Sequence, residues 1–108
     1  MKLKIGQEIK FKDSFEIETF SGRKINVKEG DKGFITGSGF IKHTSGNARG
    51  IMQKLDDMEI IGYDYENISK MILNRLNGVF GLEEFLSYEE IDIKEFINEI
   101  EDLLRDIL

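Results

Sequence analysis

The stretch EGDKGFITGSGFIKHTSGNARG, residues 29–50, decides how the first half of the chain folds. It holds six of the chain's eleven glycines and repeats the tripeptide Gly-Phe-Ile at residues 33–35 and 39–41. Glycine adopts positive φ without strain, so glycines placed between short apolar pieces are typical of tight hairpin turns. The stretch therefore predicts two strands that fold back on each other across residues 36–38.

A phosphate-binding loop is a second interpretation of the same glycines. Such a loop needs a lysine and then a serine or threonine directly after its second glycine, at the start of a helix, whereas Phe40 and Ile41 follow Gly39. The dinucleotide fingerprint is also missing, because no third glycine stands three residues after Gly39. We therefore expect turns here, and no bound nucleotide or other cofactor.

The only histidine, His43, stands beside Thr44 and Ser45, which are the residue types of a base and a nucleophile. Adjacent residues of a strand or turn rarely align for this chemistry, and a lone histidine in a chain without cysteine cannot build a zinc site. Paired carboxylates such as Glu83 and Glu84 point apart in helices and strands, so they do not form an acid/base pair. We expect no catalytic residue, no metal site and no enzyme, with His43 as a polar residue at a hairpin tip.

Short strands are expected on both sides of the glycine-rich stretch. Apolar and polar residues alternate over residues 4–13 and 13–20, which is the period of half-buried strands. Further short apolar pieces, each bounded by turn residues, occupy residues 24–27, 50–55 and 58–63. This spacing predicts five to seven short strands in a small antiparallel barrel or rolled sheet.

From Tyr63 onward the apolar residues follow the helical period instead. A first helix begins after the capping residue Asp64, and its apolar stripe is Ile68, Met71, Ile72, Leu76, Val79 and Phe80. After a short segment at residues 82–90, a second strong helix begins at Asp92, and its stripe is Ile93, Phe96, Ile97, Ile100, Leu103, Leu104 and Ile107. No proline or linker-like stretch divides the chain, so we predict one α+β domain over residues 1–108, with a barrel part at 1–62 and a helical part at 63–108.

Length and composition set further limits. The 108 residues are enough for one domain, and the absence of cysteine excludes disulfides and thiolate chemistry. Neither an N-terminal apolar signal nor a run of about 18 apolar residues is present. We expect a cytoplasmic protein with no membrane contact.

Charge divides the chain at the same place as periodicity. Residues 1–62 hold eleven Lys/Arg and nine Asp/Glu, a net +2, whereas residues 63–108 hold four and twelve, a net −8. Within the first part, residues 21–54 carry seven Lys/Arg against two Asp/Glu, a net +5. Such asymmetry indicates the kind of partner each part could bind.

The run VKEGDKGFITGSGFI, residues 27–41, resembles the glycine-aspartate turn and following strand of small Src-homology-3-type barrels, including the KOW class of ribosomal and transcription proteins. The resemblance extends over residues 4–61 and implies a small barrel. The whole chain is also similar to short uncharacterised proteins carried by phages and conjugative elements of AT-rich Gram-positive bacteria, which often act as inhibitors of host defence, such as anti-CRISPR proteins. No binding or catalytic position carries over from either resemblance.

Two functional hypotheses follow. In the first, the chain binds a basic surface of a host protein, such as the nucleic-acid channel of a nuclease, through a carboxylate-rich helical surface: Glu83, Glu84, Glu89, Glu90, Asp92, Glu95, Glu99 and Asp102. In the alternative, the barrel binds nucleic acid through cations interleaved with aromatic residues: Arg23, Lys24, Lys28, Lys32, Phe34, Phe40, Lys42 and Arg49. The acidic pI of about 4.8 favours the first. Self-association of the chain and a purely solubilising role for the acidic faces are left open by the sequence.

Overall fold

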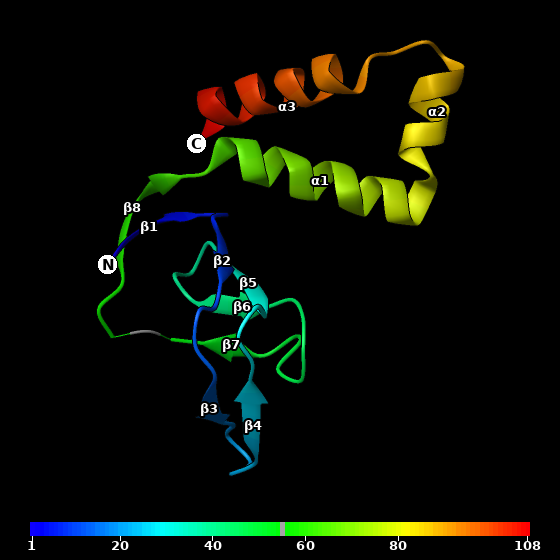
Figure 1. Cartoon of the computed structure of the whole chain (residues 1–108). Helices are drawn as coiled ribbons and strands as arrows, with labels where there is room; N and C mark the ends of the chain where they lie inside the picture. The colour runs from blue at the N-terminus through cyan, green and yellow to red at the C-terminus, as the bar shows by residue number, and fades with distance from the viewer. Residues whose placement is uncertain (55) are drawn as a thin grey trace. The chain divides into compact units, whose positions relative to one another are not determined.

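The computed structural model describes residues 1–54 and 56–108. The fold is α+β, with antiparallel strands followed by three C-terminal helices in the described residues (Figure 1). The chain divides into two compact units, Met1–Gly62 and Tyr63–Leu108. We call these the strand unit and the helical unit. The boundary lies where the apolar period changes from two residues to that of a helix, and the prediction of one cooperative domain stays a prediction.

In the described residues, the strands of the strand unit form three separate sheets. β2 (Glu8–Lys10), β5 (Lys32–Ile35), β6 (Ile41–His43) and β7 (Met52–Gln53) form the largest sheet, in the order β2-β5-β6-β7. β3 (Phe15–Glu18) pairs with β4 (Lys24–Val27), and β1 (Lys2–Ile5) pairs with β8 (Glu59–Tyr63). The segment expected at residues 50–55 contains β7, and residue 55 itself lies outside the described residues.

The glycine-rich stretch forms the predicted hairpin. β5 and β6 are antiparallel with Phe34 opposite Lys42 and Ile35 opposite Ile41, which confirms the two strands folded back on each other. Gly39 closes the turn at φ +83°, a conformation that residues with a Cβ rarely adopt. Gly33 is needed for a different reason, because a Cβ there would lie 2.7 Å from the backbone oxygen of Lys42. The glycines thus determine both the turn and the close approach of the two strands.

Replacing Gly33 with valine is expected to lower the free energy of unfolding by about 2 kcal/mol, because β5 and β6 would have to move apart. Gly37→Ala is the matched control, since nothing lies within 4 Å of a Cβ at that position and its φ is not positive. Urea unfolding of both variants measures the difference. Equal stability of the two variants would contradict the close-packed hairpin.

Two apolar clusters hold the strand unit together. Leu3, Ile35 and Ile41 form one cluster, with Ile9, Phe11 and Met58 packed against it. Ile25, Val27 and Ala48 form the other, with Phe11, Phe15, Ile17 and Ile51 packed against it. Phe11 contacts both clusters and therefore connects the β3–β4 hairpin to the large sheet. Alternation along each strand supplies these residues, since buried and exposed positions alternate in β4 and β6.

The predicted closed barrel is not found in the described residues. Gly6, at φ +84°, ends β1 and separates it from β2, so the alternating segment at residues 4–13 supplies two short strands in different sheets. The β3–β4 hairpin is not hydrogen-bonded to the large sheet, and pairing stops at β7. Closure of a barrel needs every edge strand to find a partner, and β3 and β7 do not pair with each other.

The helical unit contains α1 (Tyr65–Phe80), α2 (Leu82–Tyr88) and α3 (Ile93–Ile107). The Asp64 carboxylate accepts a hydrogen bond from the Asn67 amide at 3.0 Å, and the Asp92 carboxylate accepts one from the Lys94 amide at 2.7 Å. Both predicted helix starts are therefore confirmed. α3 runs back along α1, and α2 connects their far ends (Figure 1).

The predicted apolar stripes are only partly buried. In α1, Leu73 is buried, whereas Val79 and Phe80 are 62% and 76% exposed. In α3, Leu103 and Ile107 are also exposed, and no residue of the helix is fully buried. These residues stay exposed because a helix with few neighbouring elements is not covered along the whole length of a wide apolar face.

Candidate protein-interaction surface

A sharp corner between α1 and α2 builds the most distinctive surface of the helical unit. Gly81 adopts a left-handed conformation, φ 64° and ψ 38°, and its amide donates to the carbonyl of Asn77 at 2.9 Å. The same residue is the N-cap of α2, and the Asn77 side-chain oxygen accepts a hydrogen bond from the Glu83 amide at 2.9 Å. These bonds fix the direction in which α2 leaves α1.

Leu86 is the anchor of α2. It is 1% exposed, and it is the one buried residue of this seven-residue helix. Helices this short are unstable in isolation, so packing rather than propensity keeps α2 folded. With Leu86 turned inward, the other face of α2 must point away from the helical unit.

Large aromatic side chains occupy the outward face of α2 and the adjoining end of α1. Phe80 is 76% exposed, Phe85 is 57% exposed and Tyr88 is 85% exposed. Together with Gly81, Glu84 and Glu89 they line a shallow hollow on the surface. Single exposed apolar residues are ordinary, but three aromatic residues around one hollow are typical of a contact surface. We call this set, with the neighbouring Glu83 and Glu90, the corner surface.

The sequence-predicted carboxylates surround the corner surface in part. Glu83, Glu84, Glu89 and Glu90 are exposed, and in the described part of the chain none of them forms an ion pair. Glu90 lies at φ 58°, in the turn that leads to α3. The structure therefore brings two of the eight predicted carboxylates, Glu84 and Glu89, to the hollow with the aromatic residues, and Glu83 and Glu90 follow next to them in the chain.

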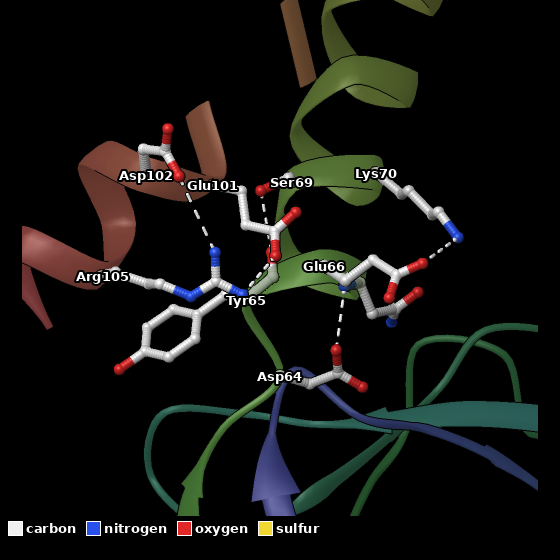
Figure 2. Close-up of polar contacts among 9 residues, drawn as sticks. Asp64, Tyr65, Glu66, Ser69, Lys70, Glu101, Asp102 and Arg105 are labelled. Carbon is white, nitrogen blue, oxygen red and sulfur yellow. Dashed lines mark hydrogen bonds and ion pairs between the residues drawn. The ribbon is translucent and has the colours of Figure 1, made fainter. Parts of the chain in front are cut away.

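The remaining predicted carboxylates lie along α3. Asp92 caps the helix, and Glu95 and Glu99 are exposed without an ion pair among the described residues. Asp102 lies 3.8 Å from the Arg105 guanidinium, which bonds Glu101 at 2.5 Å (Figure 2). Acidic charge is thus partly compensated at the end of α3 and uncompensated at the corner surface.

The opposite end of the helical unit is ordered by pairing. Arg105 lies over the Tyr65 ring, 5.5 Å from its centroid, so the last turn of α3 is held against the first turn of α1 (Figure 2). On α1, the Glu66 carboxylate bonds Lys70 at 3.0 Å and raises the pKa of that ammonium group. At this end the ion pairs join Lys70 to Glu66 and Arg105 to Glu101, whereas the glutamates of the corner surface form no ion pair among the described residues.

Sequence reasoning missed the aromatic half of the corner surface. The helical period assigns Phe80 to the apolar stripe of the first helix, and it does not single out Phe85 and Tyr88. A signal was present, since residues 80–90 read FGLEEFLSYEE, in which aromatic residues alternate with pairs of glutamates around one apolar anchor.

The cations and aromatic residues of the alternative hypothesis fall into three places on the strand unit. Lys32, Phe34 and Lys42 share the outer face of the large sheet, because Phe34 stands opposite Lys42 and Lys32 opposite Lys10. Phe40 is half-buried at the start of β6, where its carbonyl accepts a hydrogen bond from Thr36. The other cations lie outside this sheet: Arg23, Lys24 and Lys28 belong to the β3–β4 hairpin, and Arg49 to the turn before β7.

His43 is buried, not a residue at a hairpin tip. It is 1% exposed in β6, and one face of its ring stacks on Phe11 with 5.1 Å between ring centroids. Its Nε2 bonds the Gln53 side chain at 2.8 Å, whereas Ser45 accepts a hydrogen bond from the Lys32 amide. The prediction was wrong because β6 continues through residue 43, and alternation then places His43 on the same face as Ile41.

In residues 1–54 and 56–108, no group of three or more His, Asp or Glu side chains is arranged to hold a metal ion. None of the helices described has both the length and the apolar character that crossing a membrane requires. No protein-family model, curated protein or solved structure gives a match to the chain.

Proposed function

We propose that this chain is a non-catalytic protein-binding module whose corner surface binds a basic partner protein. The observation that carries this proposal is the exposed aromatic group of Phe80, Phe85 and Tyr88 beside four carboxylates without ion pairs. Aromatic residues in the centre of a contact supply most of its binding energy when they leave water. Charges around them select the partner and speed its approach.

The partner surface that fits has a definite chemistry. It presents an apolar side chain or cleft for the aromatic residues, with lysine or arginine residues around it to face the glutamates. The nucleic-acid channel of a nuclease combines basic side chains with flat apolar faces for stacking bases. A chain that occupied such a channel would inhibit the nuclease, and a cytoplasmic location is part of this proposal.

A purely solubilising role explains the carboxylates but not the aromatic residues. Surfaces that only keep a protein in solution avoid exposed aromatic residues. The corner surface places Phe85 between Glu84 and the anchor Leu86, so the apolar and acidic groups occupy one short helix. This arrangement supports binding over solubility alone.

The test is affinity capture from an extract of the cells in which the chain occurs, followed by binding measurements with the recovered protein. We expect a basic protein whose affinity falls as salt rises, because salt screens the glutamates. Reversing Glu84 and Glu89 to lysine should slow association roughly tenfold at low salt. Reversing Asp56 and Asp57, which are exposed on the strand unit, makes the same change of net charge and is the control.

Two results would contradict the proposal. One is a partner that binds the Glu84→Lys, Glu89→Lys variant as fast as the wild type. The other is the recovery of nucleic acid in place of a protein.

A second candidate function is nucleic-acid binding by the outer face of the large sheet. The observation that favours it is the cross-strand placement of Phe34 beside Lys42, with Lys10 and Lys32 on the same face. Bases stack on aromatic rings and phosphates pair with such cations. Against it, Lys32 lies 3.8 Å from Glu8, and the chain carries a net charge of −6. In line with this second function, we propose that the strand unit is an open form of the Src-homology-3-like barrel.

The two candidates predict opposite results for one pair of variants. If the corner surface is the binding site, Phe34→Ser and Lys42→Glu leave partner affinity unchanged within about twofold. If the sheet binds nucleic acid, the same changes weaken the binding of a single-stranded oligonucleotide by roughly tenfold or more. Fluorescence anisotropy with labelled single-stranded DNA and RNA distinguishes them.

A further inference from the structure

A hollow on the strand unit lies where the large sheet stops. Its walls are residues 17–20, at the end of β3, and residues 50–54, around β7. Ile17 and Ile51 contribute apolar surface, and Phe20 is fully exposed at its rim. Glu18 and Lys54 flank it, and in the described chain neither forms an ion pair. The hollow thus separates two strand edges that a closed barrel would join.

The β3 side of this hollow is an unused hydrogen-bonding edge. Phe15 stands opposite Val27 and Ile17 opposite Ile25, and the Thr19 amide donates to the Arg23 carbonyl at 2.9 Å. In an antiparallel pair, every second residue turns its backbone groups to the partner strand. The backbone groups of Glu16 and Glu18 therefore point away from β4, and no backbone hydrogen bond to them is found in the described residues.

On the β7 side, too, no further strand is paired in the described part of the chain. The His43 amide donates to the Ile51 carbonyl at 2.9 Å, and the Gly50 amide donates to the His43 carbonyl at 2.7 Å. By the same alternation, the backbone groups of Met52 point away from β6. Both walls of the hollow therefore offer backbone donors and acceptors to which another extended backbone can bond.

We propose that this hollow binds an extended segment of a partner protein by strand addition to β3. The segment places apolar side chains at alternate positions over Ile17 and Ile51, and its backbone bonds the free edge at Glu16 and Glu18. Between the apolar positions it carries charges of both signs, a cation facing Glu18 and a carboxylate facing Lys54. This site lies on the strand unit and does not depend on the corner surface.

A second copy of the chain is a poorer occupant. Two β3 edges paired with each other would place Glu16 and Glu18 against the same glutamates of the other copy, and like charges opposite each other destabilise a strand pair. The β7 edge is two residues long as a strand, too short to pair alone. The free β3 edge and the opposite charges of Glu18 and Lys54 therefore fit a segment of another protein that carries charges of both signs.

The test uses the synthetic peptide KVEVKVE, blocked at both ends, at concentrations at which light scattering shows it to be monomeric. Its near-zero net charge keeps it from binding the acidic helices by charge alone. We expect saturable binding in calorimetry by the whole chain. The same peptide with N-methyl groups on alternate residues, which cannot form the ladder, should not bind, and a scrambled peptide of the same composition should bind far more weakly.

Two variants locate the site on the protein. Glu18→Pro removes an amide that points away from β4, and Phe20→Ser removes a fully exposed ring, so both leave the hairpin bonds in place. Each should weaken peptide binding roughly tenfold. Asn26→Pro, which removes an outward amide on the other edge of the hairpin, and Phe80→Ser on the corner surface are the matched controls and should bind as the wild type does.

Four outcomes would overturn the proposal. These are no binding of the peptide, equal binding of the N-methylated peptide, wild-type affinity of Phe20→Ser, and a concentration-dependent dimer that Glu18→Pro abolishes. The last result would assign the edge to a second copy. Corner-surface variants that no longer bind the basic partner would not change the results of these peptide measurements. The two proposals can therefore fail separately.

Discussion

Replacing Phe85 and Tyr88 together with serine is expected to weaken binding of the basic partner by roughly 100-fold, the largest effect on function that we predict. Both rings are more than half exposed, so neither holds the helical unit together, and the loss must come from the contact itself. Calorimetry with the recovered partner measures it. Most of the change should appear in the dissociation rate, since the glutamates that attract the partner remain.

The matched control for this double variant is Leu103→Ser with Ile107→Ser on α3. These side chains are also 57% and 68% exposed, and they lie outside the hollow lined by Phe80 and Phe85. The control variant should bind within about twofold of the wild type. Equal losses in both variants would show that apolar exposure in general, not the corner surface, causes the binding.

Leu86→Ala is expected to cost about 3 kcal/mol of unfolding free energy, the largest effect on stability that we predict. Leu86 is 1% exposed and is the buried anchor of a helix too short to fold without it. Amide hydrogen exchange should show α2 opening first, with α1 and α3 still protected. Phe85→Ala, on the neighbouring exposed position, should leave exchange in α2 nearly unchanged.

Leu86→Ala also tests how binding depends on folding. If α2 unfolds locally, partner affinity should fall even though no contact residue has been changed. Full affinity with an unfolded α2 would mean that the partner orders the segment itself, and that the corner surface is not a preformed site.

Local signals made the helices predictable. Asp64 and Asp92 stand one residue before their helices, and caps of this kind act over a single turn, so the sequence contains all the information they need. The β5–β6 hairpin was predictable for the same reason, since Gly39 closes it within a few residues.

Long-range pairing was not predictable in this way. Whether β3 meets β7 depends on the path of more than thirty residues between them, and alternation within each strand says nothing about which edges join. A barrel was therefore predicted, and no closed barrel is found in the described residues. His43 is an intermediate case, because the local pattern Ile41-Lys42-His43 indicates an inward histidine once β6 is known to include it.

The acidic charge of the candidate site was predictable from the sequence. The exposed aromatic residues at its centre were not. A count of glutamates over residues 83–99 gives the acidic character directly. The exposure of Phe80 depends on where α1 ends relative to its buried residue Leu73, and a shift of one residue in that ending would change which side chains are covered.

Gly81 serves two helices at once, as the last cap of α1 and the first cap of α2. A residue inserted between Leu73 and Gly81 would turn the point where the chain leaves α1 by about 100° and carry α2 to another side of the helix. Substitutions at this corner change its chemistry, whereas insertions and deletions would change where it points. Among descendants of this chain, we therefore expect the length of the segment from Leu73 to Leu86 to vary less than its residues do.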